Sequence, residues 1–333
     1  MTRSRTALAP AFDGSALGTA SRRRVVALGG GHGLAASLQA LRRVTDSLTA
    51  IVGVADDGGS SGRLRSEFGV LPPGDLRMAL AALCGDDSWG RTWEQVIQHR
   101  FGGSGDLAGH SVGNLLITAL WEQTGDAVTG LDWVAALLEA HGRVLPCSDV
   151  PLTILAEVLG HDPEHPDAVS IVRGQVEVAT TPGTVLGIAL EPPEPPACRE
   201  ALAAVREADA IVLGPGSWYT SVIPHLVIPE LARAITDSPA RRIVVLNLNP
   251  QVGETTGFAS HTYLDVLYNY LPDLRVDTVI ADRHHVEDMD ALRRSCHDLG
   301  AEIFLMDVAR SGGEHAGMHD PQRLAVAFDT VLA

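Results

Sequence analysis

The sequence predicts an α/β fold in which helices cover both faces of a doubly wound, mostly parallel β-sheet. Short apolar segments alternate with stretches of helical periodicity along most of the chain, as in strand–helix–strand units. Several of these apolar segments end directly in glycine-rich turns. Apolar residues make up 45% of the 333 residues, so the chain can build a large core.

A leader that we expect to be disordered precedes the first unit. Residues 1–24 are rich in Ala, Ser, Thr and Arg, lack a continuous apolar segment and end in the basic run Arg22–Arg24. Val25–Leu28 is then a short strand, Leu34–Val44 has helical periodicity and Ile51–Ala55 is the next strand. Together they have the size of one mononucleotide-binding half, about 30 residues.

The middle of the chain departs from this pattern. Loops and helices continue to about His141, and residues 144–190 are then rich in β-forming segments separated by turns. The strands expected there are Ser170–Val172, Gln175–Ala179 and Val185–Leu190. We therefore expect an antiparallel β excursion from the main sheet, closed by the proline-rich segment Glu191–Ala197.

A second α/β half follows the excursion. Its expected elements are a helix at Arg199–Ala208 and strands at Ala210–Leu213, Ile243–Leu248, Thr278–Ala281 and Ile303–Met306. Parallel strands place their carboxyl ends at one edge of a sheet, so the loops that follow these strands are where a ligand is expected.

Composition excludes several classes of function. The formal net charge of −16 argues against general nucleic-acid binding, which needs a basic surface. No apolar run approaches the roughly 18 residues of a membrane span. The cysteines lack the spacing of a zinc site or a disulfide framework, which indicates free thiols in the cytoplasm. They are Cys84, Cys147, Cys198 and Cys296.

The first chemical motif is the glycine-rich turn after Val25–Leu28. Gly31, Gly33 and Ala36 fit the G-x-G-x-x-A form of the dinucleotide fingerprint, with a strand before it and a helix after it. These glycines and Gly30 allow backbone N–H groups to approach an anion at the positive end of the helix. The fold is therefore expected to be Rossmann-like, with one domain over residues 25–333. The motif fits any nucleotide ligand, and a tight turn without a ligand is the alternative.

The second motif follows directly after the expected strand Ile51–Ala55. Asp56 and Asp57 stand where a ribose-binding acid is expected, and adjacent carboxylates could equally bind sugar hydroxyls or Mg²⁺. Ser60 lies in a loop rich in hydrogen-bond donors, and Arg63 and Arg65 can pair bidentately with phosphate. A solvated loop with internal ion pairs is the alternative.

Two further motifs precede helices. In Leu71–Arg77, Asp75 is expected to cap the helix, and Arg77 to face either a ligand or the surface. In Gly109–Asn114, glycines flank the start of a helix, a position that can bind an anion or the polar edge of a ligand. His110 is expected to be a structural hydrogen-bonding residue.

The last two motifs follow apolar strands, at residues 214–221 and 250–258. The first motif suggests a crevice between the halves of the sheet. The second motif is a candidate ligand-binding loop, and an ordinary surface loop is the alternative. No GxSxG elbow, Walker A or HExxH motif is present. The histidines in polar, turn-like sequence are interpreted as surface residues; they are His161, His165, His284 and His285.

Six of these motifs, taken in order, resemble those of the YvcK-type gluconeogenesis-factor family in its actinobacterial form. They are GGGHGL, ADDGGSSGRLR, LPPGDLR, GHSVGNLL, GPGSWYTSVIPHL and NPQVGETTGF. The resemblance runs from about Arg24 to His319–Asp320. It implies a Rossmann-like fold related to the CofD-type 2-phospho-lactate transferases of deazaflavin synthesis. It also implies UDP-sugar binding, notably of UDP-N-acetylglucosamine, and a regulatory role in cell shape and cell-wall synthesis during gluconeogenic growth. Members of the family are substrates of Ser/Thr kinases.

The resemblance carries ligand contacts over to Gly30, Gly31, Gly33, Asp56, Asp57, Asn114, Gly214, Gly216 and Ser217. We add the neighbouring candidates His32, Ser60, Arg63, Arg77, Thr220, Ser221, Phe258 and Arg310. His32 stands where many relatives have threonine, and Phe258 stands where other members have a tyrosine implicated in ligand binding. Arg310 is matched to a ligand-binding arginine near the C-terminus.

Three functions follow from these observations. The first is a non-enzymatic UDP-sugar sensor that requires no cofactor and works with cell-wall synthesis proteins and a kinase, as a homodimer by default. The alternative is a CofD-like transferase in which Asp56 and Asp57 hold Mg²⁺. An NAD-dependent oxidoreductase rests on the glycine fingerprint alone.

Overall fold

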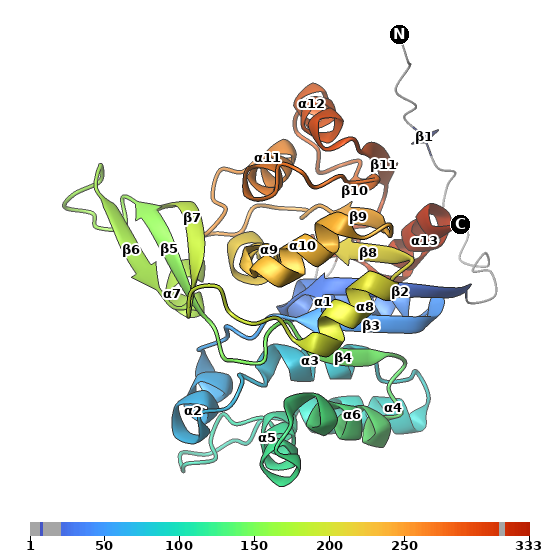
Figure 1. The fold of residues 1–333 in the computed structure, drawn as a ribbon. Helices are drawn as coiled ribbons and strands as arrows, with labels where there is room; N and C mark the ends of the chain where they lie inside the picture. Colours follow the sequence, from blue (N-terminus) through green and yellow to red (C-terminus); the bar gives the residue numbers. More distant parts are fainter. Residues whose placement is uncertain (1–6, 9–20, 313–316) are drawn as a thin grey trace.

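The computed structural model describes residues 7–8, 21–312 and 317–333, which form a large parallel sheet and a small antiparallel one (Figure 1). The large sheet has the order β1-β11-β10-β9-β8-β2-β3-β4, and every pairing in it is parallel. Its strands are β1 (Ala7–Leu8), β2 (Ser21–Gly29), β3 (Thr45–Val52), β4 (Arg143–Pro146), β8 (Ala210–Leu213), β9 (Arg241–Val245), β10 (Thr278–Asp282) and β11 (Glu302–Met306).

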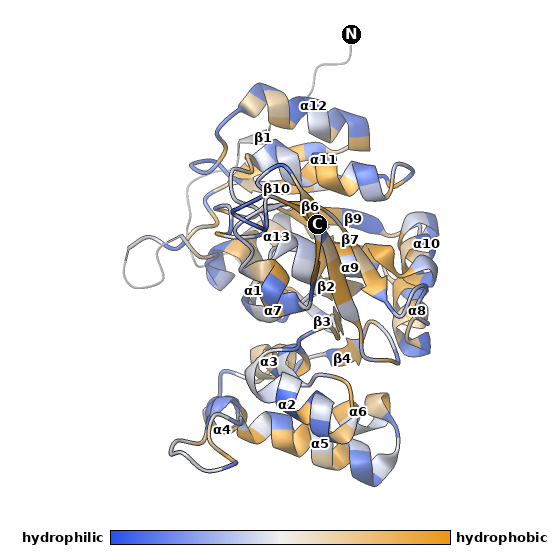
Figure 2. Ribbon diagram, turned by 90° about the vertical axis from the view of Figure 1, so that its left-hand side faces the viewer, coloured by the Kyte–Doolittle hydropathy of each residue, from blue (hydrophilic) through white to orange (hydrophobic). Residues whose placement is uncertain are grey.

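Helices cover both faces of this sheet, as a doubly wound fold requires. Helices α1 and α13 lie on one face, and α8 and α10 lie on the other (Figure 2). Helices α4, α5 and α6 pack together beyond the β4 edge (Figure 1). The helices of these layers are α1 (Gly31–Leu41), α2 (Gly59–Phe68), α3 (Gly74–Ala82), α4 (Ser88–Gln98), α5 (Val112–Thr124), α6 (Ala127–Leu138), α8 (Arg199–Glu207), η1 (Trp218–Val222), α9 (Ile223–Val227), α10 (Pro229–Asp237), α11 (Ser260–Tyr270), α12 (Met289–Leu299) and α13 (Pro321–Leu332).

The core is built on the central strands. Every residue of β8 and β10 is buried, and Val25–Leu28 of β2 is also buried. Apart from Thr278 and Asp282 at the ends of β10, these buried residues are apolar and do not alternate with polar ones, which is typical of parallel strands covered on both faces. The predicted Rossmann-like α/β fold is confirmed.

The chain reverses its direction across the sheet at β2. From β2 it runs outward through β3 to β4, and it then returns to β8 on the other side of β2. It continues outward from there through β9 and β10 to β11. Such a switch point leaves a crevice at the carboxyl ends of the central strands, where ligands of doubly wound proteins bind.

The antiparallel excursion is confirmed, but its composition differs from the prediction. It consists of β5 (Thr153–Leu159), β6 (Val169–Arg173) and β7 (Thr184–Glu191), in the order β6-β5-β7, and it projects from the main body (Figure 1). It begins after β4, because Val144 belongs to the parallel sheet. The strand β5 was not expected.

Gln175–Ala179 is the helix α7 and not the expected strand. The backbone N–H groups of Gln175 and Val176 donate to the carboxylate of Asp57, at 3.1 Å each. This capping by a distant residue overrides the β preference of the two valines in the segment, Val176 and Val178.

Most of the expected leader, residues 1–24, lies outside the described residues. Its last four residues, Ser21–Arg24, begin β2, because the Arg24 N–H and guanidinium both bind the Asp209 carboxylate. The next strand also begins earlier than predicted, since β3 covers Thr45–Val52. Across the described part of the chain, no helix is long and apolar enough to cross a membrane.

Candidate functional site

The glycine-rich turns after β2 and β8 lie against each other at the switch point. A Cβ atom at Gly33 would lie 2.2 Å from the Pro215 carbonyl oxygen and 2.5 Å from Gly216 Cα, so only glycine fits there. Ser37 Oγ, one turn further along α1, donates to the Gly214 carbonyl oxygen at 3.1 Å. Two motifs that are far apart in the sequence therefore form one surface.

Asn247, directly after β9, fixes the second of these turns. Its side chain accepts the Gly216 N–H at 2.9 Å and donates to the Gly216 carbonyl oxygen at 2.7 Å. Sequence analysis missed Asn247. The predicted strand Ile243–Leu248 contained Asn247, whereas β9 ends at Val245, so the available signal was a polar residue near the carboxyl end of an apolar run.

A crevice of about 250 Å³ opens above these turns. Segments after β2, β8, β9 and β11 contribute to it, so it lies across the switch point. Its lining comprises His32, Gly33, Ala36, Pro215, Gly216, Asn247, Leu248, Asn249, Pro250, Gln251, Gly317, Met318 and His319.

Two residues of this lining carry buried polar atoms without a partner. Gln251 Oε1 and His319 Nε2 have no hydrogen-bond partner among the residues that the structure describes. Burial lowers the pKa of His319 to about 4, so its imidazole is neutral at physiological pH. Buried polar atoms are rarely left unpaired. Both atoms are closed off from solvent, so a ligand in the crevice would pair with them only after the two side chains turn toward it. Neither residue was predicted as a contact.

Glu254, in the β9–α11 loop, is another buried residue whose polar side-chain atoms have no hydrogen-bond partner among the described residues. Its carboxylate approaches the start of η1, at Trp218 and Thr220, but no contact there meets the distance and angle of a hydrogen bond. Burial raises its pKa to about 7, while the Thr220 hydroxyl and the Trp218 backbone amide oppose this rise. Thr220 and Ser221 are themselves buried, and a Cβ atom at Gly30 would lie 3.4 Å from Ser221 Oγ.

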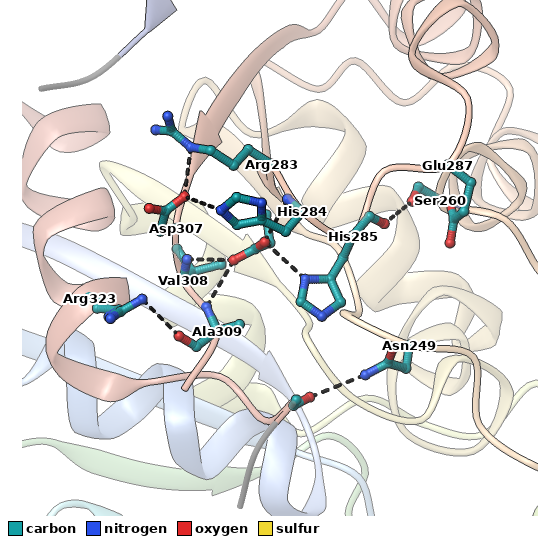
Figure 3. Close-up of polar contacts among 12 residues, drawn as sticks. Asn249, Ser260, Arg283, His284, His285, Glu287, Asp307, Val308, Ala309 and Arg323 are labelled. Carbon is teal, nitrogen blue, oxygen red and sulfur yellow. Dashed lines mark hydrogen bonds and ion pairs between the residues drawn. The ribbon is translucent and has the colours of Figure 1, made fainter. Parts of the chain in front are cut away.

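A carboxylate at the end of β10 organises the neighbouring loops (Figure 3). Asp282 accepts the N–H groups of Val308 and Ala309 and the Nδ1 atom of His285, at 2.8 to 2.9 Å. His285 is therefore largely buried and structural, so the surface interpretation was wrong for it. His284 is exposed as expected and lies 3.4 Å from Asp307.

A pair of carboxylates lies on the other side of β2. Asp75 Oδ2 would be 2.5 Å from a Cβ atom at Gly30, and Asp56 Oδ2 would be 2.5 Å from one at Gly74. Burial, and secondarily the charge of Asp56, raises the pKa of Asp75 to about 7. Asp75 lies in the first turn of α3 and does not cap it, because the N-cap is Pro73.

Two charged candidates of the second motif are engaged elsewhere. Asp57 was expected to act with Asp56 on a ligand, but its carboxylate caps α7. Arg63 was expected to pair with phosphate, but its guanidinium donates to the carbonyl oxygens of Asp106 and Ala108. Arg65 likewise donates to the Leu152 carbonyl oxygen at 2.6 Å.

Arg77 is buried inside a polar network and faces neither open surface nor the crevice. Its Nε atom donates to Asn114 Oδ1 at 3.0 Å, and Asn114 Nδ2 donates to Ser60 Oγ at 3.0 Å. Ser60 Oγ also contacts His110 Nδ1 at 2.9 Å, which confirms the structural interpretation of that histidine. Burial lowers the pKa of Arg77 to about 10, so it stays charged.

The remaining candidates take different positions. Gly31 begins α1 with a φ of 57°, and Ser217 precedes η1. Phe258 packs edge-on against Tyr219 and Tyr263, with ring centroids 6.1 and 5.3 Å apart, and does not line the crevice. Arg310 contributes its backbone N–H to the Met318 carbonyl oxygen at 2.8 Å, which supports the segment Gly317–His319.

Comparison with known proteins identifies the family. Residues 25–315 match the family model described as 2-phospho-L-lactate transferase CofD. A putative gluconeogenesis factor of Mycobacterium tuberculosis is 51% identical over 93% of this chain and 90% of its own length. The chain belongs to the gluconeogenesis-factor family, within the CofD group.

More distant relatives agree with this assignment. The gluconeogenesis factor of Halalkalibacterium halodurans is 38% identical over 80% of each chain. A crystal structure of a UPF0052-family protein from Bacillus halodurans superimposes with a TM-score of 0.81 at 32% identity, covering 93% of this chain and 99% of the other. The expected resemblance is confirmed.

Proposed function

We propose that this gluconeogenesis factor binds a UDP-sugar, UDP-N-acetylglucosamine or a close relative, in the crevice at the switch point. The observation that carries the proposal is the contact between Gly33 and the Pro215–Gly216 turn. It places two glycine-rich turns and the start of α1 around one crevice, where an anionic diphosphate would meet backbone N–H groups. Unpaired polar atoms of Gln251 and His319 in the same lining suit the hydrogen-bonding groups of a base or sugar.

We further propose that the protein acts as a regulator and not as a catalyst. In this role it would couple the supply of nucleotide sugar to cell shape and cell-wall synthesis during gluconeogenic growth. The names of the mycobacterial and bacillar relatives support the gluconeogenic setting. Interaction with cell-wall synthesis proteins and phosphorylation by a Ser/Thr kinase belong to the same proposal.

Thermal shift with a panel of nucleotides tests the ligand class. UDP-N-acetylglucosamine and UDP-glucose should raise the melting temperature progressively with concentration, because a ligand that binds only the native state stabilises it by mass action. GDP and NAD serve as comparison ligands at equal concentration. A concentration-dependent shift with NAD, together with none for any UDP-sugar, would overturn the assignment.

A CofD-like transferase is the second candidate, and the position of Asp56 favours it. The carboxylate that lies near Asp56 is that of Asp75, and not that of Asp57 as expected. Two neighbouring carboxylates supply the oxygen ligands that Mg²⁺ prefers. Asp56 and Asp75 would hold the ion, which would neutralise charge on a transferring phosphate group. Among the described residues, no group of three or more His, Cys, Asp or Glu side chains forms a ready metal site.

Chelation separates these two functions. For a sensor, UDP-sugar binding should persist in EDTA, and Asp56→Asn should weaken it only modestly. For a transferase, EDTA should abolish the interaction, and turnover of a phosphate-linked group should depend on added Mg²⁺. Metal-dependent group transfer would contradict the regulatory proposal.

A further inference from the structure

Arg77 is a buried cation whose hydrogen-bonding capacity is largely unused. Only 4% of its surface is exposed, yet the one hydrogen bond of its guanidinium is the Nε bond to Asn114. Its two terminal nitrogens have no partner among the described residues, and they are not among the buried polar atoms sealed from solvent. Burial of a charge is costly unless that charge is paired, so this arrangement indicates a missing anion.

The chain makes specific room for this arginine. A Cβ atom at Gly113, in the first turn of α5, would lie 2.7 Å from the Ile97 carbonyl oxygen, 2.8 Å from Arg77 Cγ and 2.9 Å from Arg77 Cδ, so the glycine leaves room for both the α4 backbone and the arginine stem. The LPPGDLR and GHSVGNLL motifs therefore pack against each other where Arg77 meets Gly113. A surface arginine that was buried by chance would not need a glycine on a neighbouring helix.

Other cations surround the same position. Burial is the main cause of the lowered pKa values of Arg77 and His110, and nearby arginines add to it: Arg100 for Arg77, and Arg63 and Arg100 for His110. These three arginines come from α2, from α3 and from the segment before α5. Two carboxylates, Asp56 and Asp75, also lie near enough to raise the pKa of Arg77, but among the described residues neither forms an ion pair or a hydrogen bond with its guanidinium.

We propose that Arg77 is the centre of an anion-binding subsite, distinct from the crevice, for a phosphate or carboxylate group. The free Nη1 and Nη2 atoms offer the two parallel donors that a bidentate oxyanion accepts. Arg100 adds charge, and the Ser60–Asn114 pair holds the guanidinium in place. The subsite exists whether or not the crevice binds a UDP-sugar.

The test uses inorganic phosphate as the probe, with sodium chloride at matched ionic strength as the control. Phosphate should raise the melting temperature of the full-length wild-type protein in a saturable manner, beyond the effect of chloride. Arg77→Met, which keeps the volume and removes the charge, should weaken phosphate binding at least tenfold. Without phosphate, this variant should melt at the wild-type temperature or above, because it no longer buries an unpaired charge.

Arg65→Met is the matched control, because both terminal nitrogens of Arg65 already donate, one to the Leu152 carbonyl oxygen and one to the Thr153 hydroxyl. This variant should melt at a lower temperature but bind phosphate with wild-type affinity. If Arg77→Met fails to fold, Arg77→Gln retains a donor for Asn114 and should show the same loss of binding. Equal phosphate affinity of wild type and Arg77 variants, or no stabilisation of the wild type beyond chloride, would overturn the proposal.

Addition of UDP-N-acetylglucosamine identifies the source of the anion. Independent, additive stabilisation by the two ligands would support a subsite that is distinct from the crevice and takes a separate phosphorylated or carboxylated ligand. Competition between them at Arg77 would contradict that separation, because the nucleotide sugar would then place its own diphosphate there.

Discussion

At the level of single residues, glycines at the switch point have different roles. Gly31 has a φ of 57°, which L-residues rarely adopt, whereas Gly33 is required by the approach of the Pro215–Gly216 turn. The fingerprint predicted that both positions must be glycine. It could not predict the partner of Gly33, because that contact depends on where β8 lies in the sheet.

Gly33→Ala should therefore destabilise the protein and weaken ligand binding. The new methyl group would push apart the turns after β2 and β8, and overpacking of this kind costs about 1–3 kcal/mol. Chemical denaturation measures this effect, and Gly102→Ala is the control, because a Cβ atom at Gly102 would meet no other atom within 4 Å. Equal stability of the Gly33 variant and wild type would mean that the two turns are not in contact.

Asp75 should make stability depend on pH. Its pKa in the folded protein is raised to about 7, above the ordinary carboxyl value near 4, so the folded state binds more protons than the unfolded state between these values. The contribution of Asp75 to the free energy of unfolding therefore falls as the pH rises from about 4 to about 7.

Asp75→Asn removes this titration. Relative to wild type, the variant should gain stability as the pH rises through that window, by an amount on the order of a few kcal/mol. Urea denaturation at several pH values measures the difference. A constant difference between variant and wild type across the window would show that Asp75 ionises normally.

Charged residues were the least predictable part of the site. Asp57 and Arg63 each fit a ligand contact by residue type and position. In the structure, the Asp57 carboxylate instead accepts hydrogen bonds from the N-terminus of α7, and the Arg63 guanidinium donates to two backbone carbonyl oxygens. Such partners lie far away in the sequence, and only the tertiary fold selects among the many acceptors available to a long side chain.

At the level of elements, buried parallel strands were predicted best. Strands β8, β10 and β11 lie within about a residue of their predicted bounds, because each is a continuous apolar run ended by a turn. In the excursion the signal is weaker: β5 was missed, and α7 was predicted as a strand. Both errors arise in short segments where burial on one face and a distant cap decide the structure.

Asp57→Ala should loosen α7 from the β3–α2 loop. Loss of an N-terminal carboxylate cap costs about 1 kcal/mol, and the effect should be concentrated in the excursion. Hydrogen exchange of the Gln175–Ala179 amides should accelerate in the variant. Asp273→Ala is the control, because Asp273 is exposed and lies outside the excursion and its cap; equal exchange in both variants would contradict the capping role.

At the level of the whole molecule, the order of strands makes the site. The doubly wound pattern and the ligand-bearing edge were predictable from the alternation of strands and helices. Two contributors to the crevice, Asn247 and the segment Gly317–His319, were not predicted. They reach it because β9 and β11 follow β8 outward in the sheet, a topology that the sequence pattern leaves open.

A crystal structure of the protein with UDP-N-acetylglucosamine tests the central claim most directly. The account predicts that the ligand lies in the crevice, with its diphosphate near the start of α1 and its polar groups paired with Gln251 Oε1 and His319 Nε2. A nucleotide sugar bound outside the crevice, with these two atoms still unpaired, would contradict the account.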